Sequence, residues 1–383
     1  MNDLLLERIA HEFGTPCYVY DLDQISHQVD VLREALTGAR LFYAVKANPC
    51  GAILKNLATK DVGAEVISMG ELERAVHAGI KPENIVLGGP RQDTQLIGRA
   101  LDLGVRLFSI DSVSQWESWK PFLRADLYFV LRVNPALDPR THEHLATGAA
   151  ESKFGLTFAE TRVLASEVQA HAQLAGFHVH AGSQITATEV YDEIFEVLEP
   201  LYNENPNCRY LDIGGGYGVP GFELEAFRQR VLAFAQKFEL QVILEPGRFL
   251  VAEAGVLLTS VLHHKAGALH HIIADAGMAD LLRPALYGAK HPIRVLHHAP
   301  AKLLADVDGP LCENADRLAR NVNLPELKGG EILVVEQAGA YGFAMSSNYA
   351  SSYRPAEVVI QGGQYRLARQ RESLSDLIRL ELL

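Results

Sequence analysis

The sequence has few cysteines, no long apolar run and no cluster of basic residues. Its four cysteines, Cys17, Cys50, Cys208 and Cys312, include no Cys-x-x-Cys pair, so the sequence indicates neither a zinc site nor a redox motif of that kind. So few thiols in a chain of 383 residues are typical of a reducing compartment, which predicts a cytoplasmic protein. No apolar run approaches the ~20 residues of a membrane span, and the charged N-terminus lacks the apolar centre of a signal peptide.

The charge balance argues against nucleic acid and anionic membranes as partners. The formal net charge is −12, and the lysines and arginines are scattered along the chain. Hydrophobic residues make up 48%, charged residues 21%, and the mean hydropathy is +0.03, which is an ordinary globular composition. The length suits two domains. We therefore expect a soluble two-domain protein that acts on a small molecule.

Apolar segments and helical patterns alternate along most of the chain. The apolar segments are nearly continuous runs, as expected for parallel strands that are covered on both faces. Between two of them, Phe227, Val231, Phe234 and Phe238 recur on one helical face. Eight repeats of strand and helix predict an α/β fold, a (β/α)8 barrel of the TIM type, with a doubly wound sheet as the alternative. The eight segments are residues 41–45, 64–68, 84–88, 106–111, 127–133, 176–180, 210–214 and 241–245.

The chain changes character after residue 252. Short strand-like runs follow, with Gly-Gly turns at 329–330 and 362–363. They predict a C-terminal, mainly β domain of sandwich-like or barrel-like form. Since a barrel of this type takes ~250 residues, we expect residues 20–252 to form the barrel and 253–383 the β domain, with 1–19 packing on it. The runs are residues 256–262, 271–274, 331–337, 356–361 and 365–369.

A lysine stands where the first predicted strand ends. Lys46 follows an apolar run directly, and Asn48-Pro49 breaks the chain after it. A buried lysine is tolerated where its pKa is lowered or its amine is consumed in a Schiff base. A lysine that extends from the strand end to solvent is the alternative. Active sites of such barrels lie at the C-terminal ends of the strands, which makes Lys46 a candidate.

Three more strand ends carry polar residues or glycines. His178 and His180 alternate onto one side of a strand, where a histidine can stack on a planar ligand or transfer protons; the alternative is a core histidine. The glycines at 214–216 expose backbone N–H groups that can hold a phosphate, although a plain tight turn would also explain them. Glu245 and Arg248 either form an ion pair or bind two parts of one ligand. An amine, a histidine, a phosphate cradle and a carboxylate at one barrel mouth are what pyridoxal 5'-phosphate needs.

These motifs, in this order, resemble the alanine-racemase-fold (fold type III) decarboxylases that use pyridoxal phosphate. The resemblance covers nearly the whole chain through Ala-Val-Lys-Ala-Asn at 44–48, His-Ala-Gly-Ser at 180–183, the glycines at 214–216 and Glu-Pro-Gly-Arg at 245–248. Within that family, the C-terminal half is similar to the diaminopimelate decarboxylases, through the segments 275–278, 283–287, 309–313, 339–343 and 346–349.

The resemblance implies a carboxy-lyase of lysine biosynthesis that converts meso-2,6-diaminopimelate to L-lysine and CO2. It implies a homodimer in which Cys312 and Glu313 of one subunit act at the site of the other, and no metal. As catalytic residues it implies Lys46, which binds the cofactor covalently, His180, which stacks on its ring, and Cys312. Further implied cofactor contacts are Ser183, Gly215, Gly216, Glu245, Gly247, Arg248 and Tyr341. Implied substrate contacts are Arg248, Arg283, Tyr287, Glu313 and Tyr341.

Other functions stay open at this stage. Glu65, Met69, Ala279 and Asn314 stand where the family pattern suggests aspartate, glycine, asparagine and serine. Several of these lie near the expected substrate, so a decarboxylase of the same fold that acts on another amino acid, or on a carrier-linked siderophore precursor, is the main alternative. A racemase of this fold should offer the pyridine nitrogen a basic partner, which Glu245 is not. A protein that only binds the cofactor would not need the Cys312-Glu313 pair.

Overall fold

The computed structural model describes residues 1–137, 151–297 and 300–382. The chain divides into two compact units, one formed by Ser26–Phe249 and the other by Met1–Ile25 together with Leu250–Leu383. In the part of the chain that the structure describes, no helix is both long enough and apolar enough to cross a membrane.

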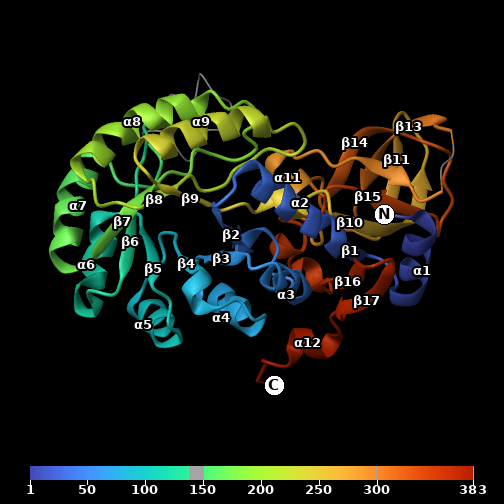
Figure 1. The fold of residues 1–383 in the computed structure, drawn as a ribbon. Helices are drawn as coiled ribbons and strands as arrows, with labels where there is room; N and C mark the ends of the chain where they lie inside the picture. The colour runs from blue at the N-terminus through green and yellow to red at the C-terminus, as the bar shows by residue number, and fades with distance from the viewer. Residues whose placement is uncertain (138–150, 298–299, 383) are drawn as a thin grey trace. The chain divides into compact units, whose positions relative to one another are not determined.

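The first unit is a closed barrel of eight parallel strands (Figure 1). Each strand pairs in parallel with its neighbour, and β2 pairs with β9 to close the ring. The predicted (β/α)8 barrel is confirmed, and the doubly wound alternative is wrong. The strands are β2 (Arg40–Ala44), β3 (Gly63–Val66), β4 (Ile85–Leu87), β5 (Leu107–Ile110), β6 (Tyr128–Arg132), β7 (Gln173–His178), β8 (Tyr210–Asp212) and β9 (Gln241–Leu244).

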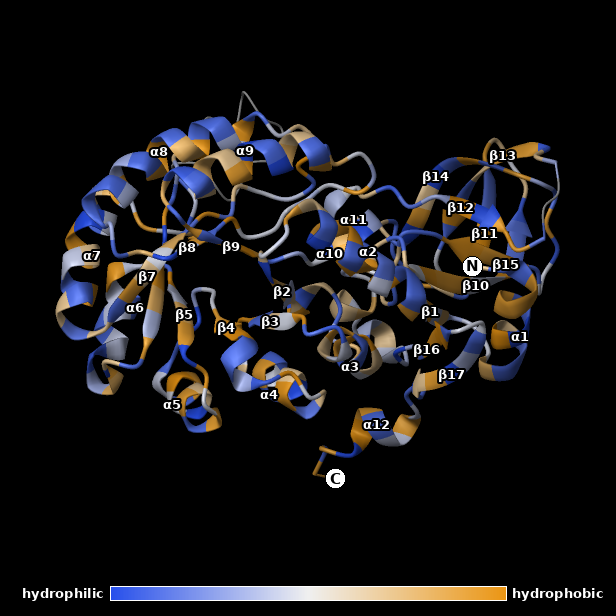
Figure 2. Ribbon diagram, viewed as in Figure 1, coloured by the Kyte–Doolittle hydropathy of each residue, from blue (hydrophilic) through white to orange (hydrophobic). Residues whose placement is uncertain are grey.

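Helices alternate with the strands, beginning with one that precedes β2, and cover the outside of the barrel. They are α2 (Leu22–Ala35), α3 (Gly51–Thr59), α4 (Met69–His77), α5 (Thr94–Leu103), α6 (Val113–Trp119), α7 (Phe158–His171), α8 (Val190–Glu204) and α9 (Leu224–Lys237). The predicted apolar face holds for Phe227, Val231 and Phe234, which are buried, whereas Phe238 caps the end of α9 and is half-buried. Polar residues colour the other faces of α8 and α9 blue (Figure 2).

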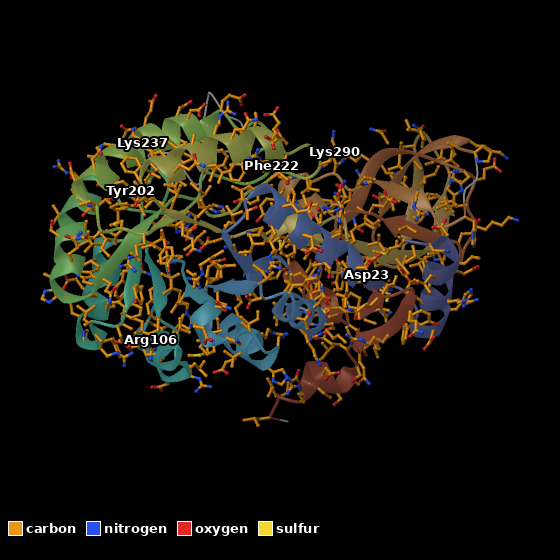
Figure 3. All side chains as sticks on the ribbon, viewed as in Figure 1. Asp23, Arg106, Tyr202, Phe222, Lys237 and Lys290 are labelled. Carbon is orange, nitrogen blue, oxygen red and sulfur yellow. The ribbon has the colours of Figure 1, made fainter. Side chains whose placement is uncertain are left out.

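The helices pack inward through large side chains. Tyr202 of α8 is buried, and its hydroxyl donates a hydrogen bond to the Tyr210 carbonyl oxygen of β8 at 2.7 Å. Lys237, at the end of α9, reaches the outer surface of the unit instead (Figure 3). Inside the ring, six apolar side chains from alternating positions form one buried cluster, so the barrel centre is a packed core and not a channel. These are Phe42, Val86, Leu107, Val130, Ala175 and Ile243.

All eight barrel strands end one or two residues earlier than predicted, and those predicted to end at 68, 180 and 214 end two residues earlier. Ser68 is not a strand residue but the N-cap of α4, where its hydroxyl accepts a hydrogen bond from the Glu71 amide. Strand β7 ends at His178, so His180 lies in the loop beyond it and not on the same strand. Both differences arise because polar side chains near the barrel mouth bond to backbone groups and end the regular ladder.

The second unit is built around a nine-stranded sheet. The strand order is β14-β13-β11-β10-β1-β16-β17, and β15 pairs with both β10 and β12. Its strands are β1 (Cys17–Asp21), β10 (Gly255–Lys265), β11 (His270–Ala274), β12 (Ile293–Val295), β13 (Leu303–Asp308), β14 (Arg317–Leu324), β15 (Ile332–Val335), β16 (Ala356–Gln361) and β17 (Gln364–Arg369). Its helices are α1 (Asp3–Phe13), α10 (Arg248–Val251), α11 (Arg283–Tyr287) and α12 (Leu374–Ile378).

The N-terminal segment is an integral part of this sheet unit. Strand β1 lies between β10, its antiparallel neighbour, and β16, its parallel neighbour. Leu6 and Ile9 of α1 are buried in one apolar cluster with Val256, Leu258 and Val358. The first residues therefore belong to the core of this unit, whereas the sequence pattern had not predicted β1, β12, β13 or β14 as strands.

Candidate active site

Lys46 is held by a carboxylate at the carboxyl end of the barrel strands. Strand β2 ends at Ala44, and a 3₁₀ turn, Val45–Ala47, carries the lysine. Its Nζ donates to Glu65 Oε2 at 2.8 Å, and the Glu65 side chain is only 5% exposed while that of Lys46 is 37% exposed. Because Ala44 and Glu65 are register partners in β2 and β3, the sheet itself brings the two side chains together. The alternative of a lysine that merely extends to solvent does not fit this ion pair.

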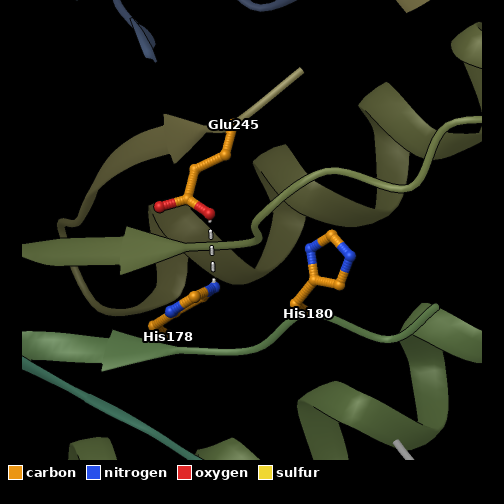
Figure 4. A group of neighbouring side chains, drawn as sticks. All are labelled: His178, His180 and Glu245. Atoms are coloured by element: carbon orange, nitrogen blue, oxygen red, sulfur yellow. Dashed lines mark ion pairs between the residues drawn. The ribbon is translucent and has the colours of Figure 1, made fainter. Parts of the chain in front are cut away.

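His178, His180 and Glu245 converge beside one another (Figure 4). His178 Nε2 lies 3.6 Å from Glu245 Oε2, which is too long for a hydrogen bond and would be an ion pair only with a protonated ring. The Nδ1 atom of His180 accepts a hydrogen bond from the Gly215 amide at 3.1 Å. Burial, reinforced by the charges of Arg132 and Lys46, lowers the pKa of both histidines well below the ordinary value, so both rings are neutral at physiological pH.

Glu245 and Asp212 form a buried acidic group. Burial raises the pKa of Glu245 well above its ordinary value, and the negative charges of Asp212 and Glu65 raise it further. Burial also raises the pKa of Asp212. Glu245 Oε1, Asp212 Oδ2 and His178 Nε2 are buried without a hydrogen-bond partner among the residues that the structure describes. Such atoms in one place are satisfied either by a proton that the two acids share or by a ligand.

The glycines at 214–216 form a turn that allows no side chain. Gly214 and Gly216 have φ angles of +65° and +94°, which glycine adopts without strain. A Cβ atom on Gly215 would lie 2.3 Å from the Glu245 carbonyl oxygen, and one on Gly216 would lie 2.2 Å from that of Gly182. The turn is therefore more than a generic bend, because its glycines allow close approach of the segments that carry Glu245 and Ser183. Ser183 is exposed next to this turn.

Several site residues have no clear sequence signal. Ser109 of β5 lies within hydrogen-bond distance of His178, with 2.8 Å between its Oγ and the ring Nδ1, and thereby fixes that ring. Arg132 ends β6, lies 3.4 Å from Asp111, and stacks over the Phe154 ring at 4.7 Å. A serine in an apolar strand or an arginine at its end is common, so only the assembled barrel shows that Ser109 and Arg132 belong to the site. The one available signal was a charged residue directly ending an apolar run, which applies to Arg132.

Among the residues that the structure describes, two groups have donor atoms close enough to hold a metal ion. In the group of His178, His180 and Glu245 the ligand atoms lie within 4.8 Å of one another, and the Gly215 amide leaves only Nε2 of His180 for such a role. The second group is His271, Asp306 and Asp308. In that group, Arg317 contacts Asp306 at 3.2 Å and Asp308 at 2.5 Å, so an internal cation already neutralises the carboxylates.

The second unit holds the remaining residues named from the sequence. Arg283 begins α11, is only 9% exposed, and its Nη1 lies 3.1 Å from His291 Nε2, so it is not a surface arginine. Tyr287, at the other end of α11, is exposed. Tyr341 is half-buried and has a φ of +58°. Cys312 and Glu313 are exposed on the connection between β13 and β14, which removes the alternative of an inert buried thiol for Cys312.

Comparison with known proteins decides the family. Residues 22–252 match the family model of the pyridoxal-dependent decarboxylase, pyridoxal binding domain. The chain is 39% identical to the diaminopimelate decarboxylase of Deinococcus radiodurans, over 98% of both chains, and 37% identical to that of Zymomonas mobilis, over 100% of this chain and 96% of the relative. The chain belongs to the diaminopimelate decarboxylase family of pyridoxal-dependent enzymes. A solved diaminopimelate decarboxylase from Helicobacter pylori, complexed with L-lysine, has a TM-score of 0.91 at 34% identity and covers 98% of this chain and 99% of its own.

The barrel residues of this decarboxylase fit pyridoxal phosphate. The cofactor has an aldehyde, a basic ring nitrogen and a phosphate. Lys46 offers an amine, and the buried Glu245 offers an oxygen that has no partner among the described residues. The glycine turn at 214–216 carries no side chain of its own that would cover a phosphate, and in this structure the Gly214 and Gly215 amides donate to Asp212 and His180.

Proposed function

We propose that this chain decarboxylates meso-2,6-diaminopimelate to L-lysine and CO2. The observation that carries the proposal is the similarity, over nearly the full length, to diaminopimelate decarboxylases, one of which was solved with L-lysine bound. When bound, pyridoxal phosphate supplies a sink for the electron pair that remains when CO2 leaves. The protein's task is to hold the reacting groups, exclude water and place protons.

We assign the cofactor contacts to the barrel unit. Lys46 supplies the Nζ that becomes bound to the cofactor, and Glu65 neutralises that amine until it reacts. His180, kept neutral and fixed by the Gly215 amide, presents a flat ring for stacking. Glu245, with its raised pKa, would hold a proton toward the nitrogen of a bound pyridoxal ring, whose role as an electron sink depends on that proton.

Phosphate and substrate contacts complete the assignment. Ser183, Gly215 and Gly216 hold the phosphate, with support from Gly247, Arg248 and Tyr341. Arg248, Arg283, Tyr287 and Tyr341 contact the substrate. An arginine suits the distal carboxylate of diaminopimelate, which simple diamine precursors such as ornithine lack, so Arg283 reads that group. A glutamate suits the distal ammonium, so Glu313 reads that one. Either the Cys312 thiol or the Lys46 ammonium would protonate the reacting carbon.

The substrate assignment is tested by product analysis. Purified protein with pyridoxal phosphate is mixed separately with diaminopimelate, lysine, ornithine and arginine, and CO2 and amino-acid products are measured. Release of CO2 with formation of lysine from diaminopimelate alone is expected. Arg283→Gln should lose most of this turnover, because the neutral amide cannot pair with the distal carboxylate, while its cofactor absorption stays unchanged. Turnover of another amino acid with none of diaminopimelate would overturn the assignment in favour of a decarboxylase for a different substrate.

We further propose a homodimer with shared active sites. Cys312 and Glu313 are exposed side by side on one connection, as residues that serve a second subunit must be. An equimolar exchange of Cys312→Ala and Lys46→Ala proteins tests the arrangement. After exchange, about half of the dimers would contain one subunit of each variant. Each mixed dimer would have one intact site, with Lys46 from one subunit and Cys312 from the other, so about a quarter of the wild-type activity should return. Activity that stays at the level of the separate variants would contradict shared sites.

Domain limits and location complete the proposal. We assign residues 20–252 to the cofactor-binding domain and 253–383, with 1–19, to the second domain; the family match at 22–252 and the two compact units support these limits. The small number of cysteines in a chain of this length supports a cytoplasmic location.

A further inference from the structure

The connection between β13 and β14 is a short loop that presents the proposed catalytic pair. It runs over residues 309–316, with Cys312 and Glu313 exposed near its middle. At its base, Arg317 Nε lies 2.5 Å from Asp308 Oδ1, and these two residues are register partners of the two strands. One residue of the loop differs from its neighbours, since Asp316 is only 2% exposed.

The carboxylate of Asp316 is held by backbone amides from two segments. The Met278 amide donates to Oδ1 at 2.5 Å, and the Leu311 amide donates to Oδ2 at 2.7 Å. The Gly309 amide donates to the Asp316 carbonyl oxygen at 2.8 Å, and the Asp316 amide donates to that of Glu313 at 3.1 Å. Asp316 therefore binds both sides of the Cys312-Glu313 loop and fastens the loop to the segment that contains Met278.

Two glycines make room for this carboxylate. A Cβ atom on Gly277 would lie 2.3 Å from Asp316 Oδ1, and one on Gly309 would lie 2.2 Å from the same oxygen. Neither glycine has a positive φ, so backbone conformation does not require glycine at either place. The glycines are explained by the buried carboxylate alone.

The side chain at the tip is held as well. The Tyr349 hydroxyl donates to Glu313 Oε1 at 2.5 Å, a short charge-assisted hydrogen bond. A loop that needed only to connect two strands would not need a buried carboxylate beneath it and a fixed carboxylate on its surface. Burial without a full counter-charge is costly, and it raises the pKa of Asp316 above its ordinary value.

We propose that Asp316 is a positioning residue for the decarboxylation: by gathering the amides of Met278 and Leu311 it fixes the loop that places Cys312 and Glu313, and Tyr349 fixes the Glu313 carboxylate for the distal ammonium of the substrate. The inference rests on the proposed roles of Cys312 and Glu313, and it adds the two residues through which they act.

Asp316→Asn tests the positioning role against a matched control. The asparagine keeps the size but turns an N–H donor toward one of the two amides. Asp280→Asn is the control, because Asp280 is also buried and accepts from the Gly277 amide at 2.9 Å, yet among the described residues it interacts with the loop only through the charge of Asp316 and not through a hydrogen bond. Both variants should lose some thermal stability and keep the cofactor absorption band. Only Asp316→Asn should raise the KM for diaminopimelate and lower kcat, each by about tenfold, as expected when reacting groups are displaced by a fraction of an ångström.

A second measurement does not depend on turnover. Cys312 is the one exposed cysteine of the four, so iodoacetamide without substrate should alkylate it first. Its rate of alkylation should change by about threefold or more in Asp316→Asn and stay the same in Asp280→Asn. Equal rates and equal kinetic constants in the two variants would overturn the proposal. If the wild type leaves diaminopimelate unchanged, the proposed function fails, but the alkylation rates still decide the role of Asp316.

Two further variants apply if Asp316→Asn does not fold. Gly309→Ala should change the rate of Cys312 alkylation as Asp316→Asn does, because the added methyl group displaces the Asp316 carboxylate. Tyr349→Phe changes an exposed side chain, so folding is unaffected. It should raise the KM for diaminopimelate by about fivefold with little change in kcat, since it removes orientation of a binding group only. Wild-type constants in Tyr349→Phe would exclude its part in the proposal.

Discussion

Gly215→Ala is the most direct test of the cofactor cradle. Gly215 has an ordinary negative φ, so an alanine there meets no backbone strain. The difficulty is space, because the new Cβ atom would lie 2.3 Å from the Glu245 carbonyl oxygen. The backbone around Glu245 therefore has to move by roughly 1 Å before the contact becomes an ordinary one.

The size of the effect follows from this overlap. Crowding of a packed site by one methyl group costs about 1–3 kcal/mol. In a unit of this size, each kcal/mol lowers the melting temperature by about 2–4 °C. The same movement displaces the Gly215 amide from His180 Nδ1 and shifts Glu245, so two proposed cofactor contacts change at once. Because 1.4 kcal/mol is a factor of ten in binding, we expect cofactor affinity to fall by about tenfold or more.

The assay compares Gly215→Ala with a second glycine variant. Gly98 lies inside α5, and an added Cβ would have nothing within 4 Å. Gly98→Ala should therefore stabilise the protein by about 0.5–1 kcal/mol, because alanine is the better helix former. Thermal melts of the apoprotein and titration of the cofactor absorption band give both quantities. A Gly215→Ala protein that melts at or above the wild-type temperature and binds the cofactor with unchanged affinity would refute the packing argument.

Three further predictions address the site. Lys46→Ala should abolish both the cofactor's absorption shift and the borohydride-stable mass increase on the peptide that contains residue 46; wild-type labelling at that peptide would contradict the covalent role. Ser109→Ala leaves Nδ1 of the buried His178 ring unpaired and should destabilise the protein by about 1–3 kcal/mol in thermal melts, whereas the exposed Ser114→Ala should change little. Burial raises the pKa of Glu245 in the folded state, so above about pH 4.5 the folded apoprotein keeps a proton that the unfolded chain releases. The free energy of unfolding therefore falls as the pH rises from about 4.5 to the raised pKa of the folded state. Glu245→Gln should remove part of this loss, with a gain on the order of 1 kcal/mol near pH 8 and none near pH 4, and an equal effect at both pH values would show that Glu245 does not titrate in this way.

The barrel was predictable because its strands are buried on both faces. Continuous apolar runs such as those that became β2 and β9 leave little choice of structure, and their ends mark the barrel mouth. Lys46, Glu245 and the glycines at 214–216 were therefore found as polar or flexible residues that interrupt such runs. Their approach in space then follows from parallel strand pairing alone.

The strands β13 and β14 were missed for the opposite reason. Asp306, Asp308 and Arg317 give these segments the polar character of a loop. In the structure, the arginine lies between both carboxylates, so the charges satisfy one another across the ladder. Such compensation depends on which strand lies beside which, and a single sequence does not contain that information.

The electrostatics of the barrel mouth give an argument for the cofactor that is independent of any relative. Two buried carboxyl groups, Glu245 and Asp212, destabilise a folded protein, and the positive charges of Lys46 and Arg132 offset this only in part, because the pKa of Glu245 stays raised. A fold gains nothing from a buried acid with an unpaired oxygen. The arrangement becomes favourable once a ligand brings a basic nitrogen, since the proton can then be shared and the buried oxygen is satisfied. A pyridine ring bound at Lys46 is such a ligand. The need to hold this ring therefore explains both the unfavourable burial of two acids in the apoprotein and their use in decarboxylation.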